Sequence, residues 1–89
     1  MIHITTKSQF KRDLKLCHKR GKDIDKLENI VNLLQQDQSL SQKYHDHQLT
    51  GKWKDHRECH IEPDWLLIYQ LTKLNLILVR TGTHSDLFD

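Results

Sequence analysis

The segment 57-RECHIEPDWLLIYQL-71 decides the fold, because it places a tight polar turn between two runs that are typical of β-strands. Residues 57–61 are predicted to form the first of these strands. Residues 65–71 are β-branched and aromatic and are bounded by turn residues, as expected for a buried strand. Pro63 cannot donate a backbone hydrogen bond to a neighbouring strand, so it marks the turn itself. The hairpin would hold three functional side chains close together: those of His60, Asp64 and Trp65.

Two helices are predicted ahead of this hairpin. Apolar residues recur at helical spacing between positions 10 and 17, and Gly21 offers a left-handed end to the first helix. Asp23 or Asp25 can cap the second helix. The second helix carries the broad apolar stripe expected of a core helix: Ile24, Leu27, Ile30, Val31 and Leu34. We assign this stripe to packing and give it no chemical role.

Two further strands are predicted, one at each end of the chain. Residues 2–5 alternate enough to form a short strand at or near a sheet edge, and residues 76–80 form the third strand of an antiparallel meander. The order strand, helix, helix, long loop and three strands predicts a single α+β domain over residues 1–89. Both helices would cover one face of an antiparallel sheet, and the other face would be open. The tail at residues 84–88 is expected to fray.

The segment 35–55 has no hydrophobic periodicity and is predicted to be a long loop. Such a loop is uncommon in a small domain unless it binds a partner or is mobile. Its larger apolar side chains are expected to anchor it to the domain: Leu40, Tyr44, Leu49 and Trp53. Several of its polar side chains are expected to face outward: those of His45, Asp46, His47, Lys52 and Lys54.

Positive charge is concentrated in the first predicted helix, although the net charge of the chain is only +2. Residues 7–22 are rich in lysine and arginine, and Asp13 is their sole acid. Such a local excess favours binding to a polyanion, and a solvated helix surface is the alternative interpretation. The side chains that we single out for binding are Lys11, Arg12, Lys15 and Lys19.

The composition also indicates where the protein is located. No apolar run approaches the length of a membrane span, and residues 1–10 lack the apolar core of a signal peptide, so we expect a cytoplasmic location and no membrane partner. Cys17 and Cys59 are the two cysteines, and a reducing cytosol disfavours a disulfide between them. We therefore expect two buried or half-buried free thiols.

The polar residues of the second half suit cleavage of RNA without a metal. This reaction needs a base for the 2′-hydroxyl, an acid for the departing 5′-oxygen and positive charge for the transition state. Histidine can fill the first two roles. The candidate acid–base residues are His47, His60, Asp64 and His84, the candidate cations are Arg80, Lys52 and Lys54, and the candidate surfaces for base stacking are Trp65 and Phe88. Packing in the core is the alternative role for both aromatic residues.

A zinc site is the alternative interpretation of these histidines. The segments 45–47 and 56–60 contain four histidines and Cys59, which are enough ligands for zinc. His56 and His60 would share a face only on a helix, and the pattern there favours a strand. We therefore predict neither a metal site nor a cofactor.

Two motifs resemble the bacterial toxins of the YafQ type: HDHQLTGKWKDHRECHIEPDWLLIY (residues 45–69) and, after it, RTGTHSDLF (residues 80–88). These toxins lie within the RelE-like superfamily of ribosome-dependent mRNA endoribonucleases, and the resemblance implies their α+β fold. The helical N-terminal half agrees in length and character, so the resemblance covers essentially the whole chain. Gln48 stands where relatives often carry proline, and we expect this difference to leave the chemistry unaltered.

The resemblance implies the toxin of a type II toxin–antitoxin pair, which enters the ribosomal A site and cleaves the bound mRNA codon. Matching motifs imply an active-site set of His47, His60, Asp64, Trp65, His84 and Phe88, with Arg80 near the phosphate. His84 would be the acid, and Asp64 or His47 the base. The basic first helix would contact 16S ribosomal RNA near the A site.

The resemblance also implies a protein partner. This partner would be a small antitoxin with a ribbon-helix-helix DNA-binding half and a C-terminal segment that wraps the toxin. The pair would assemble as a heterotetramer on operator DNA and repress its own operon. A function of a different class stays open: a non-catalytic RNA- or protein-binding module, in which the basic first helix binds and the histidines have no chemical role.

Overall fold

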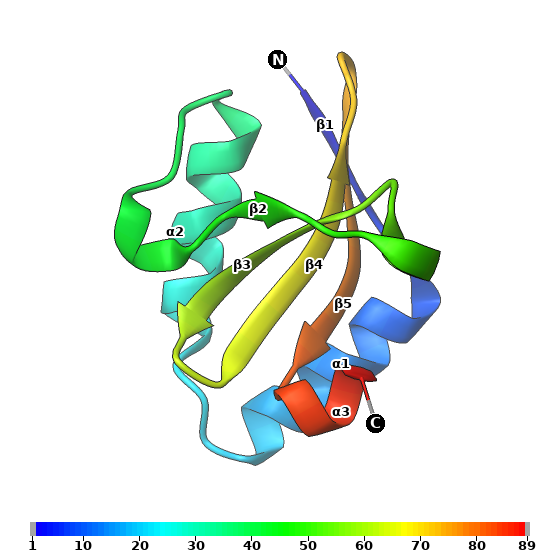
Figure 1. Cartoon of the computed structure of the whole chain (residues 1–89). Helices are drawn as coiled ribbons and strands as arrows, with labels where there is room; N and C mark the ends of the chain where they lie inside the picture. Colours follow the sequence, from blue (N-terminus) through cyan, green and yellow to red (C-terminus); the bar gives the residue numbers. More distant parts are fainter. Residues whose placement is uncertain (1, 89) are drawn as a thin grey trace.

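The predicted hairpin lies at the centre of the domain in the computed structural model, which describes residues 2–88 (Figure 1). The elements are β1 (His3–Thr6), α1 (Ser8–Lys19), α2 (Ile24–Gln35), the 3₁₀ turn η1 (Gln42–Tyr44), β2 (His47–Gln48), the 3₁₀ turn η2 (Gly51–Trp53), β3 (Arg57–Glu62), β4 (Trp65–Leu71), β5 (Asn75–Gly82) and α3 (His84–Phe88). The predicted α+β class is confirmed. Both predicted helices and all four predicted strands are present.

The strands form one five-stranded sheet in the order β1-β5-β4-β3-β2. The antiparallel meander β3-β4-β5 and the edge position of β1 agree with the prediction. The prediction of an antiparallel sheet is wrong in one respect, because β1 pairs in parallel with β5, with His3 opposite Asn75. A parallel pair needs a long connection between its strands, and the entire chain between β1 and β5 supplies it. The sheet is therefore mixed.

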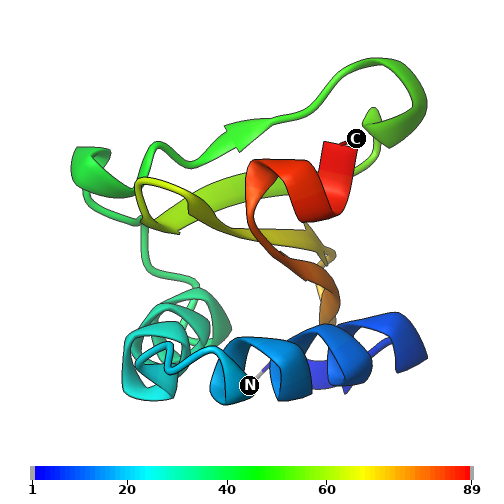
Figure 2. The ribbon, with the colours of Figure 1, turned by 90° about the horizontal axis from the view of Figure 1, so that it is seen from below.

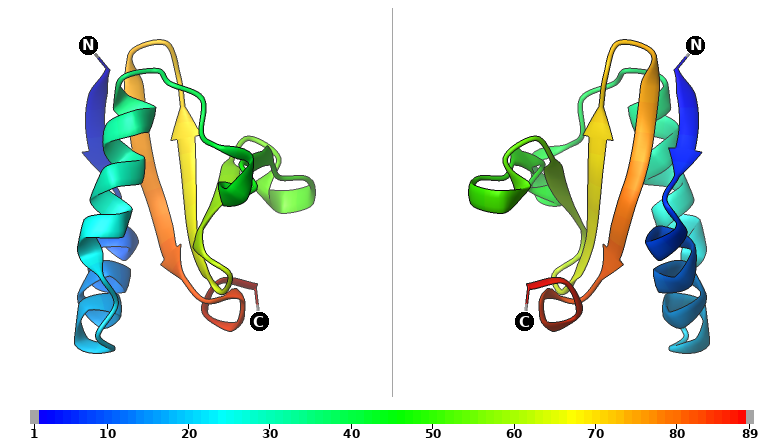
Figure 3. Two further views of the ribbon diagram at one scale, coloured as in Figure 1. Left: turned by 90° about the vertical axis from the view of Figure 1, so that its left-hand side faces the viewer. Right: turned by 90° about the vertical axis from the view of Figure 1, so that its right-hand side faces the viewer.

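The sheet lies between two unequal layers (Figures 2 and 3). Helices α1 and α2 cover one face, where alternate residues of β3 and β4 point toward them and form the main core: Cys59, Ile61, Trp65, Leu67 and Tyr69. Leu66 and Ile68 point the other way and pack with Leu87 of α3. The expectation of a frayed tail is thus wrong, and the predicted open face is covered in part, because Leu87 is only 7% exposed and packs α3 onto it.

The ends of the two long helices follow the sequence. Gly21 has φ +82°, so it supplies the left-handed conformation that ends α1. The Asp23 carboxylate accepts a hydrogen bond from the backbone N–H of Asp25 (3.1 Å), which settles the choice of cap for α2. On α2, Leu27, Ile30 and Leu34 are buried, as the apolar stripe predicts.

The segment 35–55 is more ordered than a plain loop, since it contains η1, β2 and η2. All four predicted anchors pack onto the domain, Leu40 and Tyr44 on the main core and Leu49 and Trp53 on the α3 side. The expectation that Asp46 faces outward is wrong. Its carboxylate accepts a hydrogen bond from the Tyr69 hydroxyl (2.5 Å) and pairs with Arg57 (3.3 Å).

The cysteines and the helix lengths agree with two of the simpler expectations. Cys17 and Cys59 are free and buried. Burial raises the pKa of both thiols, which keeps them protonated. In the part of the chain that the structure covers, every helix is too short or too polar to serve as a transmembrane segment.

Ile30→Ala should lower the free energy of unfolding by about 3 kcal/mol, because it removes a side chain that is only 1% exposed at the centre of the main core. Urea unfolding followed by circular dichroism measures the change. Ile4→Ala is the matched control, since Ile4 is 41% exposed, and it should cost about 0.5 kcal/mol or less. Equal losses in the two variants would contradict this packing.

Candidate active site

An imidazole–carboxylate pair joins the hairpin to the C-terminal helix. Asp64 lies in the β3–β4 turn, and His84 is the first residue of α3. One carboxylate oxygen of Asp64 accepts a hydrogen bond from the His84 backbone N–H (2.9 Å) and lies 2.6 Å from Nδ1 of the His84 ring. These two contacts lower the pKa of Asp64, the backbone N–H more than the imidazole. An ionised Asp64 keeps a proton on Nδ1, so Nε2 of His84 is left for chemistry.

A second imidazole–carboxylate pair lies on β3. Glu58 and His60 are two residues apart on a strand, so both point to the face that carries α3. The Oε1 atom of Glu58 lies 3.3 Å from Nε2 of His60, and Glu58 is only 5% exposed. The His60 ring meets the His84 ring edge to face at a centroid distance of 5.6 Å. The two pairs are therefore neighbours.

His47 completes the cluster from the edge strand β2. Its Nε2 lies 3.7 Å from the same Glu58 oxygen that contacts His60. Its Nδ1 lies 2.6 Å from the backbone carbonyl of His45, which fixes the proton on that nitrogen. When His47 is neutral, Nε2 therefore presents a lone pair.

The structure brings together the four predicted acid–base residues, which come from three distant parts of the chain. His84 contacts Asp64 and His60, and Glu58 links His60 to His47. Sequence reasoning missed Glu58. Its position two residues before His60 on a predicted strand was a usable signal, because alternation puts both side chains on one face.

Phe88 and the two predicted lysines lie on the α3 side of this cluster. The Phe88 ring is 43% exposed and lies 6.4 Å from the His84 ring and 6.4 Å from the Trp53 ring. Lys52 and Lys54 flank Trp53 in the sequence, and both are exposed. The contact between Trp53 and Phe88 therefore places the η2 turn, which contains Lys52, next to the end of α3.

Arg80 is held from the opposite layer of the domain. Its Nε and Nη2 atoms donate hydrogen bonds to Asp13 of α1 at 2.7 and 3.2 Å. The buried Asp13 carboxylate also accepts a hydrogen bond from the backbone N–H of Thr81 (3.1 Å). The guanidinium is thus oriented by a partner that neutralises its charge, and its contact with phosphate stays a prediction.

Trp65 does not fit its predicted role in substrate binding. The residue is 0% exposed, and its indole N–H donates a hydrogen bond to the Thr81 hydroxyl (2.9 Å). An indole enclosed in this way has no free face on which a base could stack. Trp65 is a core residue because it points toward the helices, on the opposite side of the sheet from the histidines.

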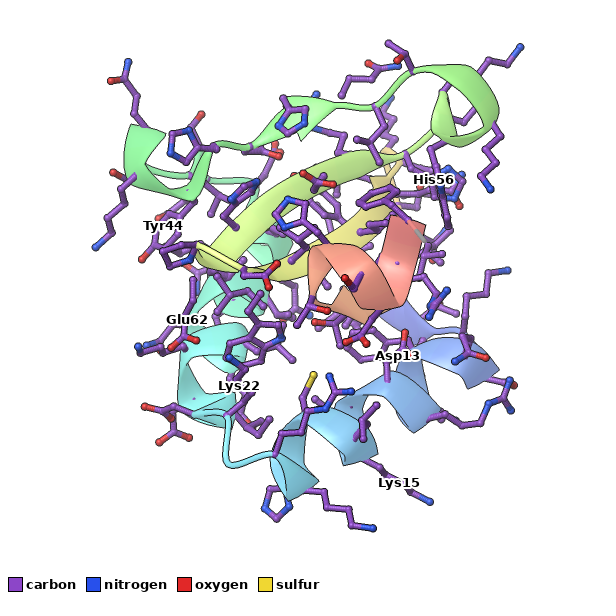
Figure 4. All side chains as sticks on the ribbon, turned by 60° about the horizontal axis from the view of Figure 1, so that its bottom comes forward. Asp13, Lys15, Lys22, Tyr44, His56 and Glu62 are labelled. Carbon is purple, nitrogen blue, oxygen red and sulfur yellow. The ribbon has the colours of Figure 1, made fainter. Side chains whose placement is uncertain are left out.

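The four basic residues singled out on α1, namely Lys11, Arg12, Lys15 and Lys19, are all exposed. Arg12 also donates two hydrogen bonds to the side-chain carbonyl of Gln9, at 2.9 and 3.3 Å. Figure 4 labels Lys15 and shows its side chain pointing away from the sheet. Since α1 covers the face opposite the histidines, these four basic residues and the histidine cluster lie on different layers of the domain.

Three residues of the cluster could hold a metal ion. The ligand atoms of Glu58, His60 and His84 lie within 4.8 Å of one another. Imidazole and carboxylate together suit zinc or copper. The ligand set weighed from the sequence is not formed, because Cys59 is buried in the main core, on the opposite face from His60. A cation at this place would occupy the nitrogen lone pairs that acid–base chemistry needs.

Comparisons with known proteins agree with the motifs. The sequence model of the family described as "Bacterial toxin of type II toxin-antitoxin system, YafQ" matches residues 2–89. The mRNA interferase toxin YafQ of Escherichia coli (strain K12) is 48% identical over 81 residues, which are 90% of this chain and 88% of that protein. These matches define the class of the protein, a toxin of a type II toxin–antitoxin system.

Solved structures extend the match to three dimensions. The crystal structure of YafQ from E. coli strain BL21(DE3) superposes with a TM-score of 0.95 at 43% identity and covers 100% of both chains. YafQ in the E. coli DinJ-YafQ toxin-antitoxin complex gives 0.93 at 45% identity, over 99% of this chain and 98% of that one. A metal-bound toxin from Helicobacter pylori gives 0.93 at 48% identity, over 99% and 100%. The chain belongs to the YafQ family, as its two motifs predict.

The carboxyl group of Asp64 should titrate below its ordinary pKa of 3.8. The His84 contacts favour the charged carboxylate of Asp64. Their contribution to the stability of the fold is therefore present above the ordinary pKa and is lost as the pH falls through the lowered pKa of Asp64. His84→Ala removes the imidazole but keeps the backbone N–H, which lowers the pKa more. The Asp64 pKa in this variant should therefore rise only part of the way back to 3.8. An NMR titration of the carboxyl carbon measures both values, and an unshifted wild-type pKa would contradict the pairing.

Proposed function

We propose that the protein is an mRNA endoribonuclease that inhibits translation by cleaving mRNA in the ribosomal A site. The observation that carries the proposal is the pairing of His84 with Asp64, beside a second pair formed by His60 and Glu58. Two imidazoles held by carboxylates at a ring distance of 5.6 Å suit one acid and one base at a single phosphate. The E. coli relative named an mRNA interferase supports mRNA as the substrate.

In the proposed reaction, the base takes the proton of the 2′-hydroxyl and the 2′-oxygen attacks the phosphorus atom. The bond to the 5′-oxygen breaks, and the acid protonates that oxygen. His84 is the acid, because the Asp64 carboxylate holds its Nδ1 atom and leaves Nε2 free to donate. Asp64 is a poor base, since its lowered pKa and its two donors hold it in the charged, hydrogen-bonded form. His60 or His47 is the base, and the Glu58 carboxylate lies 3.3 Å from the His60 ring and 3.7 Å from the His47 ring, so it can orient either one.

Other residues would hold the substrate. Lys52 and Lys54 supply positive charge to the crowded transition state, and the exposed ring of Phe88 stacks on a base. Arg80 donates to a phosphate through Nη1, since its Nε and Nη2 atoms bond Asp13. The exposed cations of α1, on the other layer of the domain, contact 16S ribosomal RNA. Because one layer of the domain would bind the ribosome and the other the mRNA, cleavage would depend on the ribosome.

A protein partner and a cellular location follow from the family. We propose that an antitoxin with a ribbon-helix-helix DNA-binding half neutralises the toxin in the cytoplasm and forms a heterotetramer with it on operator DNA. The DinJ-YafQ complex of E. coli supports an antitoxin as the partner.

His84→Ala should reduce cleavage of a translated mRNA by at least about 10², because it removes the proton donor to the leaving oxygen. Primer extension after induction maps the cuts, and growth curves report toxicity. The variant should still bind ribosomes, whereas joint alanine substitution of Lys11, Arg12, Lys15 and Lys19 should remove binding. A His84→Ala variant with full cleavage would refute the mechanism and favour the non-catalytic binding module.

Cleavage should persist in EDTA, because the proposed acid and base need no metal. Purified toxin is added to a translating extract, the ribosome–mRNA complexes are isolated, and a brief chelation precedes the assay, with magnesium restored to maintain the ribosome. The products should carry a 2′,3′-cyclic phosphate or 3′-phosphate and a 5′-hydroxyl. Loss of activity that returns only with zinc or copper would show instead that Glu58, His60 and His84 hold a catalytic ion.

A further inference from the structure

A hollow of about 720 Å³ opens beside the histidine cluster and has no role in the mechanism described above. It lies between α2, η1 and the end of β3, and Pro63 closes one side of it. His47 and His60 line both the hollow and the cluster, so the two spaces are continuous. Its volume is within the range of sites that enclose a small organic ligand.

The charges around the hollow favour an anion. Lys26 of α2 and Lys43 of η1 both line it. Its one carboxylate, Glu62, is already paired with Lys26 (2.9 Å) and Lys22 (3.3 Å), and these lysines lower the pKa of Glu62. The Glu62 carboxylate is therefore shared between two lysines, and Lys43 is a further cation beside them. Among the residues that line the hollow, two lysines stand against one carboxylate, so an anionic ligand would meet a net charge of +1 from the lining, nearest Lys43.

The hollow also offers flat and apolar surface for a base. The partly buried Tyr44 ring lines it, and the Lys43 ammonium group lies over one face of that ring, 5.1 Å from its centroid, so a base that stacks on this face would displace the lysine toward its own phosphate. Figure 4 shows Tyr44 and Glu62 on the same side of the domain, next to α2. Ile30 and Ile61 contribute buried apolar surface. Aromatic rings beside lysines are the usual means by which proteins hold single-stranded RNA.

His45 connects the hollow to the chemistry. It adopts a left-handed conformation (φ +51°, ψ +42°), which is uncommon for a residue other than glycine. In this conformation its ring lies 5.4 Å from the His60 ring, and its carbonyl accepts the hydrogen bond from His47. His45 therefore links a ligand in the hollow to both proposed bases, His60 and His47.

We propose that this hollow is a nucleotide subsite, which holds the nucleotide of the mRNA next to the scissile phosphodiester. The base of that nucleotide lies against Tyr44 and His45, and a phosphate lies against Lys43. The proposal rests on the endoribonuclease function, because it assigns the hollow to the same RNA strand. It also places the RNA on the η1 side of the cluster as well as on the Phe88 side, so the strand crosses the sheet over His60.

The experiment measures binding apart from cleavage. The probe is a short single-stranded RNA with 2′-O-methyl groups throughout and a fluorescent end label, which cannot be cleaved because its 2′-oxygens are blocked. Tyr44→Leu keeps an apolar anchor in the core and removes the ring, and it should raise Kd by about tenfold in fluorescence anisotropy. Lys43→Gln should raise Kd several-fold and reduce the slope of log Kd against log salt by about 1. Lys73→Gln, on the exposed β4–β5 turn, is the matched control and should leave Kd unchanged.

A second measurement locates the probe. Adenosine 5′-monophosphate titrated into ¹⁵N-labelled protein should shift the amide signals of residues 43–45 and of Asn29, which lines the hollow on α2. Wild-type Kd values in both Tyr44→Leu and Lys43→Gln would overturn the proposal, as would variants that lose affinity for the antitoxin and keep their affinity for RNA. If Tyr44→Leu fails to fold, Lys43→Gln decides alone, since Lys43 is exposed. If the wild-type protein does not cleave a translated mRNA, the endoribonuclease function is refuted instead. Failure of the subsite proposal and failure of the proposed function are therefore distinguishable.

Discussion

The hydrogen bonds around Thr81 hold the layers of the domain and the site in one arrangement. The Thr81 hydroxyl accepts from the indole of Trp65 (2.9 Å) and donates to the carbonyl of Leu66 (2.7 Å), while its backbone N–H donates to Asp13 (3.1 Å). Trp65, Leu66 and Thr81 are nearly or fully buried, so an unmade bond here would cost about 1–3 kcal/mol. Helix α1 and strands β4 and β5 are thereby fixed to one another three residues before His84.

The hydrogen bonds of Thr81 explain how a small domain can assemble a site from distant segments. The turn that follows β3 carries Asp64, and the turn that follows β5 leads into His84, so a rigid β4–β5 pair brings both to the same end of the sheet. Glu58 then acts from a strand that is packed on the same pair. The carboxylates come from the sheet and its turns, which are stiff, whereas two of the imidazoles come from short elements that need such support.

Sequence reasoning was most successful where local pattern and packing agree. The hairpin, the two amphipathic helices and the convergence of the histidines follow from periodicity, turn chemistry and motif. The parallel pairing of β1, the short β2 and α3 were missed, because elements of this length are stabilised by tertiary contacts rather than by their own sequence. The sequence left the role of Trp65 open between base stacking and core packing, since an indole beside a polar turn can point to either face of the sheet. Only strand register decides which face it takes.

A side chain at position 82 would disturb the start of α3. Gly82 has φ +157°, and a Cβ atom at this position would lie 2.9 Å from a carboxylate oxygen of Asp86. That carboxylate accepts from the Thr83 N–H (3.0 Å) and pairs with Arg20 (2.7 Å), so a methyl group at residue 82 would push apart the contacts that start α3. Selection for cells that survive expression of the toxin should therefore recover alleles at this glycine, although it contributes no side chain to the candidate site.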